Sequence, residues 1–252
     1  MRSALFFGGV AAIAIGLLLP ALGFQNEKDD CDGSVEFENH HNYKKTQQMY
    51  SDIYAMLISN SEARRDAMRF SEILEFNVFH IAAIFGNLDL IEALYTDDPE
   101  SIFRTDPSGF TCAHSAAQNG HLHVLKWLWQ NKRKLLYKKT PADITVMHSA
   151  AIVGRLEVVK GLWALDNSFL YQSAVDGWIP AHAAVAYCRL DVIKWMWSID
   201  QDAFARRNKE GKAPPQMINR PECTNTTRQR EVQEWFHEVQ QTRLAEPSGR
   251  AG

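Results

Sequence analysis

The sequence lacks the motifs of known catalytic sites. It contains no catalytic order of Ser, His and Asp, no nucleophile elbow, no phosphate-binding glycine loop and no CxxC pair. It also lacks an excess of one charge, because 27 Lys and Arg residues stand against 30 Asp and Glu residues and the formal net charge is -3. The two signs are interspersed, so no field of one sign attracts nucleic-acid phosphates. We therefore expect no enzyme, no cofactor and no nucleic-acid partner.

One long hydrophobic run stands at the N-terminus and differs from the rest of the chain. Arg2 precedes an uncharged apolar stretch over residues 4–24, and polar residues begin at Gln25. The small residues up to Gly23 suit signal-peptidase cleavage after that position. The run is also long enough to span a bilayer as a retained anchor. We expect residues 1–24 to be the signal peptide of a secreted or luminal protein, and a single-pass membrane protein anchored through residues 4–24 is the alternative.

Four histidines recur at a constant spacing of 34 residues, each within a similar string of small and aliphatic side chains. A leucine follows each histidine in the same register. The positions are His80, His114, His148 and His182, followed by Leu88, Leu122, Leu156 and Leu190. Because one such repeat cannot bury its apolar face alone, we expect the repeats to stack side by side.

A period near 33 residues with a small-residue helix, a glycine turn and a leucine-rich second helix resembles the ankyrin repeat. The resemblance implies an all-α solenoid of stacked helix–turn–helix repeats with finger loops. Gly86, Gly120 and Gly154 supply the left-handed turn, and Cys188 occupies that place in the fourth repeat. We expect a flexible acidic and histidine-containing lead at 25–42, an N-terminal cap at 43–75 with a helix over 43–58, four repeats at 76–210, a degenerate C-terminal capping repeat at 211–243 with a helix over 228–242, and a disordered tail at 244–252.

The repeated histidines have a structural and a metal-binding interpretation. Stacked ankyrin repeats lie about 10 Å apart, which is too far for shared metal ligation. In the ankyrin family this histidine hydrogen-bonds backbone groups and ties adjacent repeats together, and the resemblance implies the same role here. The pair His40 and His41 lies near acidic residues but has no rigid element or recognised ligand spacing, so we expect no metal site. His121 and His123 are expected to be surface residues.

Two of the four cysteines correspond in the repeat register. Cys188 lies at the turn of the fourth repeat, and Cys223 lies in an insertion at the corresponding turn of the fifth. In an oxidising compartment a disulfide between them would pin the C-terminal cap to the array. Two unpaired thiols are the alternative. Cys112 is expected to be buried, whereas Cys31 in the lead is free or intermolecular.

The same insertion, residues 220–227, carries the chain's only N-glycosylation triplet, Asn225-Thr226-Thr227. Such triplets are glycosylated on exposed loops of exported proteins, so Asn225 is a candidate glycosylation site and mild support for secretion.

The partner surface follows from the resemblance, since ankyrin proteins usually bind through their finger tips and the exposed side of the first helix. These positions carry large apolar groups, and a row of them would form a hydrophobic docking groove for a protein partner of unknown identity. The alternative is that several of these side chains fold down between fingers and pack neighbouring repeats. The predicted partner-binding residues are Phe76, Ile84, Phe85, Phe110, Ile144, Ile152, Val153, Trp178 and Tyr187.

Overall fold

The computed structural model describes residues 57–65, 67, 77–223 and 225–245. The chain divides into two compact parts, residues 1–74 and 75–252. In the first part, residues 57–59 and 61–65 are helical. Asn60 begins the second of these segments, because its Oδ1 accepts hydrogen bonds from the backbone N–H of Glu62 (2.9 Å) and of Ala63 (3.2 Å).

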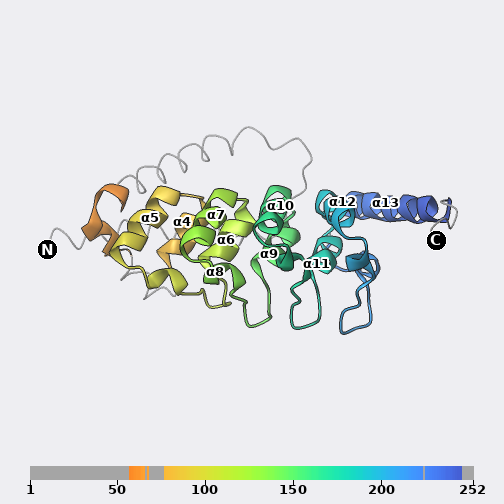
Figure 1. The fold of residues 1–252 in the computed structure, drawn as a ribbon, viewed down its shortest axis with the longest axis horizontal. Coiled ribbons are helices and arrows are strands. Elements are labelled where there is room, and N and C mark those ends of the chain that lie inside the picture. Colours follow the sequence, from red (N-terminus) through yellow and green to blue (C-terminus); the bar gives the residue numbers. More distant parts are fainter. Residues whose placement is uncertain (1–56, 66, 68–76, 224, 246–252) are drawn as a thin grey trace, which may run out of the picture. The chain divides into compact units, whose positions relative to one another are not determined.

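The second part consists of helices and loops, and its described residues contain no strand. Four consecutive repeats share one plan: a short first helix, a turn, a longer second helix and a further helical turn (Figure 1). The predicted all-α repeat fold is therefore confirmed. Repeat 1 comprises α4 (Val78–Ile84), α5 (Leu88–Asp97) and η1 (Ser101–Phe103), and repeat 2 comprises α6 (Cys112–Asn119), α7 (Leu122–Asn131) and α8 (Lys134–Tyr137). Repeat 3 comprises α9 (Val146–Val153), α10 (Leu156–Leu165) and η2 (Asn167–Tyr171), and repeat 4 comprises α11 (Pro180–Ala186), α12 (Leu190–Ile199) and η3 (Asp202–Ala205). The last repeat, repeat 5, comprises η4 (Pro214–Met217) and α13 (Thr226–Ala245).

The core runs continuously along the row of repeats. The first helices α4, α6, α9 and α11 contact one another in that order, and α10 contacts both α7 and α12. Paired alanines in every first helix, such as Ala116 and Ala117, are fully buried, so the small side chains let neighbouring helices approach closely. The second helices add buried aliphatic residues such as Leu128 and Leu162, each contributing about 1.5–3 kcal/mol.

A left-handed residue stands in the turn after each first helix of repeats 1 to 4. Gly120 and Gly154 are the C-caps of α6 and α9, both with φ of 87°. Cys188 takes the equivalent position in repeat 4 with φ of 52°, although this conformation is uncommon for a residue with a Cβ.

Hairpin-like fingers connect successive repeats. In each finger the first residue donates a backbone hydrogen bond to the carbonyl of the fifth, for example from Asp106 N–H to Phe110 O (2.9 Å). The fourth residue of each finger is left-handed: Gly109, Asp143, Gly177 or Gly211. The later fingers project to the same side of the helices in Figure 1. The fingers are residues 106–110, 140–144, 174–178 and 208–212.

The last repeat departs from the expected boundaries. Its first helix is reduced to the 3-10 turn η4, and α13 begins at Thr226 instead of 228. Asn225 explains this start, since its Oδ1 accepts a hydrogen bond from the backbone N–H of Arg228 (2.9 Å) and caps the helix. The helix continues to Ala245, two residues into the segment predicted as a tail, because the first helix breaker after it is Pro247.

Several predicted segments lie outside the described residues: the signal peptide or anchor at 1–24, the lead at 25–42 and most of the N-terminal cap at 43–75. Within the described part of the chain, no helix is both long enough and apolar enough to cross a bilayer.

Candidate functional site

The four repeated histidines tie each first helix to the following finger. In every case Nε2 lies within hydrogen-bond distance of a backbone carbonyl oxygen 30 residues later in the chain. Three of these carbonyls belong to residues that the sequence predicts to bind a partner. We call this series the forward ladder. Its bonds join His80 to Phe110 O (2.9 Å), His114 to Ile144 O (3.1 Å), His148 to Trp178 O (2.9 Å) and His182 to Lys212 O (3.1 Å).

The hydrogen bonds fix the tautomer of the buried imidazoles. The backbone N–H of Thr145 donates to Nδ1 of His148 (3.4 Å), and Thr111 does the same for His114 (3.2 Å). Because an N–H cannot accept, Nδ1 carries no proton and Nε2–H donates to the finger carbonyl. Burial lowers the pKa of His114 and of His148 to about 4, so both rings are neutral at physiological pH.

A second series of bonds runs in the opposite direction and was missed by the sequence analysis. The residue after each turn reaches back 37 positions to a carbonyl near the end of the preceding first helix. We call it the return ladder. Its bonds join His121 Nε2 to Ile84 O (2.8 Å), Arg155 Nε to Gln118 O (2.8 Å) and Arg189 Nε to Ile152 O (2.7 Å).

His121 and His123, predicted to be surface residues, both bond backbone carbonyls of repeat 1. His121 is half-buried in the return ladder, and His123 Nε2, although exposed, bonds Gly86 O (2.7 Å). The sequence could have indicated the return ladder, because positions 121, 155 and 189 follow the 34-residue step and each carries a side-chain N–H. It was not predicted, because long polar side chains are ordinarily solvated at the surface.

The predicted partner-binding residues lie at the fingers and at the ends of the first helices. The eight within the described residues are all half-buried, and Phe76 lies outside. Some of these rings pack against neighbouring side chains, which is the alternative to an open docking groove. The Phe110 ring meets the His114 ring edge-on with 5.3 Å between centres, and the Trp178 ring lies against the His182 ring with 6.4 Å between centres. The half-buried set is Ile84, Phe85, Phe110, Ile144, Ile152, Val153, Trp178 and Tyr187.

The finger tips change character along the array. Pro107, Pro141 and Ala142 are exposed and uncharged, and Val175 is 46% exposed at the tip of the fourth-repeat finger. The tip of the last finger carries Lys209 and Glu210 instead. The fingers of repeats 2 to 4 therefore expose apolar side chains beside Ser108 and Asp176, whereas the tip of the last finger carries two charged residues.

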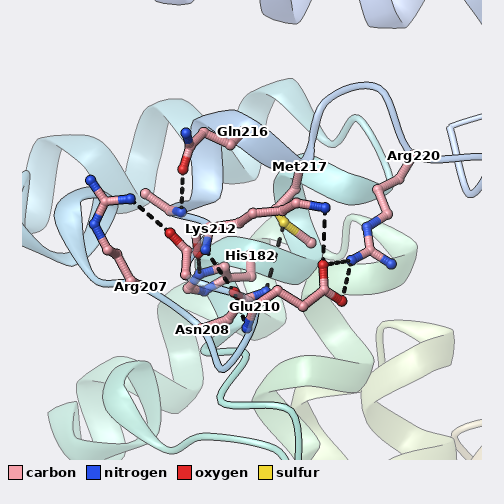
Figure 2. Close-up of polar contacts among 10 residues, drawn as sticks. His182, Arg207, Asn208, Glu210, Lys212, Gln216, Met217 and Arg220 are labelled. Atoms are coloured by element: carbon pink, nitrogen blue, oxygen red, sulfur yellow. Dashed lines mark hydrogen bonds and ion pairs between the residues drawn. The ribbon is translucent and has the colours of Figure 1, made fainter.

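Figure 2 shows how the last finger is held in a polar cluster. Glu210 pairs with Arg220, whose Nη2 lies 2.7 Å from both carboxylate oxygens, and with Lys212 at 3.0 Å. The hydrogen bond from Arg220, followed by that from Lys212, lowers the pKa of the Glu210 carboxylate. Asn208 Oδ1 accepts from the backbone N–H of Lys212 (2.9 Å), and Arg207 donates to Gly211 O (2.7 Å).

Residues 220–223, which we call the covering loop, lie against repeat 4. Arg220 stacks over the Trp178 ring, with 5.2 Å between guanidinium and ring centre. At the other end, Cys223 forms a disulfide with Cys188, with 5.7 Å between the Cα atoms. Burial and then the charge of Glu222 raise the pKa of Tyr187, the residue that precedes the disulfide-bonded Cys188. The covering loop thus contacts one predicted partner-binding residue, Trp178, and the neighbour of another, Tyr187.

The closed position of the covering loop has an unfavourable element. Trp178 Nε1 and Glu222 Oε2 are buried and have no hydrogen-bond partner among the described residues. Each buried unpaired group costs about 1–3 kcal/mol, whereas the ion pair between Arg220 and Glu210 is exposed and screened by solvent, so it contributes little. The disulfide is therefore the strongest bond holding the loop in place.

The other described cysteine has a different environment. Cys112 is a buried free thiol, and burial raises its pKa to about 12. A thiol with such a pKa stays protonated and is a poor nucleophile or metal ligand. In the described part of the chain, no group of three or more His, Cys, Asp and Glu side chains is placed to hold a metal ion.

Comparison with known proteins gives one family. The family model described as ankyrin repeats (3 copies) matches the chain over residues 48–137 and again over 79–167. Curated proteins give no match. The matched residues end before repeat 4. In the structure, repeat 4 has the same arrangement of helices, ladder bonds and finger as the matched repeats.

Proposed function

Because this chain is an ankyrin-repeat protein, and such repeats are protein–protein interaction modules, we propose that it captures a protein partner on the surface formed by its fingers and first helices. It acts by binding and not by catalysis. The open part of this surface comprises Ile84, Phe85, Phe110, Ile144, Ile152 and Val153.

One observation carries the proposal: the apolar side chains lie on backbone held by both ladders. Phe110 and Ile144 accept forward-ladder bonds, and Ile84 and Ile152 accept return-ladder bonds. A rigid backbone presents these half-buried side chains in one arrangement, so little conformational entropy is lost when a partner docks. A row of partly exposed aliphatic and aromatic groups is typical of protein–protein interaction sites.

The test compares two half-buried aromatic side chains on different faces. Phe110→Ala removes a ring from the proposed surface, and Trp163→Ala removes one from α10, where Trp163 packs against Trp195 at 5.9 Å. Partners captured from the native compartment are quantified for each variant by mass spectrometry, with circular dichroism to verify the helical content. We expect Phe110→Ala to lose the partner that Trp163→Ala retains. Equal capture by the two variants would refute this surface.

We propose further that the chain enters the secretory pathway. The apolar segment 4–24 supports this, and so does the Cys188–Cys223 pair, because disulfides persist in oxidising compartments. Asn225 is exposed, and its Oδ1 caps α13, so a glycan on Nδ2 would leave the cap in place. Translation with microsomes tests the apolar segment and the glycosylation site: we expect cleavage after Gly23 and a glycosidase-sensitive mass shift that Asn225→Gln abolishes.

A membrane-anchored scaffold that organises an assembly is the second candidate function. It is favoured by the length of the apolar run at 4–24, which suffices to span a bilayer. The same microsome experiment separates the two, since an anchored chain keeps its full length and resists carbonate extraction.

A further inference from the structure

The covering loop adds a second connection between repeats 4 and 5, beside the ladder bond from His182 to Lys212 O. It arises from the insertion in repeat 5. Besides Glu210 of the last finger, it contacts the finger and the interhelix turn of repeat 4 through Trp178 and Cys188. We propose that the Cys188–Cys223 disulfide is a redox latch: it holds residues 220–223 over Trp178, and its reduction uncovers this part of the binding surface.

The bias toward opening comes from the groups that the loop buries. Trp178 Nε1 and Glu222 Oε2 lack partners among the described residues, so water would hydrate both when the loop leaves. The remaining contacts of the loop are weak by comparison. Arg220 pairs with Glu210, which is 45% exposed, and stacks on Trp178 at 5.2 Å. Without the covalent bond, the open position is favoured.

The two sulfur atoms differ in access, which sets the course of reduction. Cys188 is 2% exposed, whereas Cys223 is half-buried. A dithiol reductant therefore attacks Sγ of Cys223 as a thiolate, forms a mixed disulfide there and expels Cys188 as a thiolate that takes up a proton. The second thiolate of the reductant then displaces Cys223 and closes its own disulfide. The protein gains two electrons and two protons, and the dithiol is oxidised.

The consequence for recognition rests on the proposed function. In the oxidised protein the fourth-repeat finger exposes Val175 at its tip, whereas Arg220 of the covering loop lies over the Trp178 ring. Reduction adds Trp178 to the accessible surface, next to the charged last finger. The reduced form therefore favours a partner whose apolar segment is followed by a charged one.

The experiment follows the Trp178 indole proton in the full chain by NMR, assigned with Trp178→Phe. Its exchange with water is measured in the oxidised protein, after treatment with dithiothreitol, and in the double variant Cys188→Ser, Cys223→Ser. Removal of the disulfide is expected to speed exchange about tenfold or more, while amides of α9 and α10 keep their protection. No partner is needed, so the result is independent of whether the proposed function is correct.

Two controls isolate the latch. Cys112→Ser removes the buried thiol and should leave exchange as in the wild-type protein, and dithiothreitol should have no effect on the double variant. Unchanged exchange of the Trp178 indole proton without the disulfide would overturn the proposal. It would also be overturned if amides of α12 and α13 lost protection to the same extent as the indole, because the disulfide would then be a staple of the whole C-terminal end.

Discussion

At the scale of single residues, the repeated histidine performs two tasks with one neutral ring. Nδ1 of His148 accepts from Thr145 at the start of its own helix, and Nε2 donates to Trp178 O in the next finger. A protonated ring could not accept the first bond, and the opposite tautomer could make neither. The local cap and the bond between repeats therefore depend on the same protonation state.

This requirement makes stability depend on pH. Burial lowers the pKa of His114 and His148 to about 4 from an ordinary value of 6.5. Between these values the unfolded chain binds a proton at each ring and the folded chain does not. The unfolding free energy should therefore fall by about 1.4 kcal/mol per pH unit for each histidine as the pH decreases from 6.5 to 4. Above pH 6.5 the rings are neutral in both the folded and the unfolded chain, so the full stability from these histidines is present. Urea unfolding across this range measures the slope.

Two variants separate titration from simple loss of a bond. His148→Gln removes one titrating ring, and its slope should be smaller than that of the wild-type chain by about 1.4 kcal/mol per pH unit. Thr145→Val loses the hydroxyl that bonds His148 Nδ1 (2.8 Å) but keeps both imidazoles, so it should be less stable with the same slope. Identical slopes for His148→Gln and the wild-type chain would show that His148 is not the titrating group.

At the scale of elements, the fingers are positioned by backbone geometry and by contact with the next finger. Val175 N–H donates to Ala142 O (3.1 Å), and Lys209 N–H donates to Asp176 O (2.9 Å). Between the fingers of repeats 2 and 3 the corresponding donor position is Pro141, which has no N–H. Close packing takes the place of that bond, since a Cβ on Gly109 would lie 2.3 Å from Pro141 Cδ.

Gly109→Ala should therefore destabilise the array more than Gly211→Ala. Both positions are left-handed, with φ of 82° and 75°, so both alanine variants bear the cost of about 1–2 kcal/mol for a Cβ in this region. Only Gly109 adds a clash with a rigid proline ring, whereas a Cβ on Gly211 meets nothing within 4 Å. Urea unfolding midpoints compare the two. Pro141→Ala should rescue much of the Gly109→Ala defect, and equal losses in the two glycine variants would contradict the packing argument.

Much of this organisation could be predicted from the sequence because it repeats. The step of 34 residues locates the first and second helices and the turn glycines, and the resemblance to the ankyrin repeat implies the role of the histidines. The return ladder shares that step, but its members His121, Arg155 and Arg189 differ in chemistry and resemble ordinary surface residues. The burial of Trp178 could not be predicted, because register gives the side of the array on which a residue lies and not what an insertion in the next repeat places over it.

At the scale of the whole molecule, stability comes from contacts between neighbours. Each central repeat packs against two others through both rows of helices and through both ladders, as α9 does with α6 and α11. The terminal helix α13 packs against α12, the second helix before it. An array of this kind behaves as a chain of coupled repeats, so a local defect propagates according to its position.

Leu162→Ala and Val232→Ala test this coupling, since both side chains are fully buried. Leu162 lies in α10, in the middle of the array, and its truncation should cost about 2–5 kcal/mol. Loss of protection should spread into repeats on both sides, because each has lost a stabilising neighbour. Val232 lies in α13, and its truncation should leave α6 to α10 protected. Hydrogen exchange with mass spectrometry resolves the two patterns, and a defect from Leu162→Ala confined to α9 and α10 would show that the repeats fold independently.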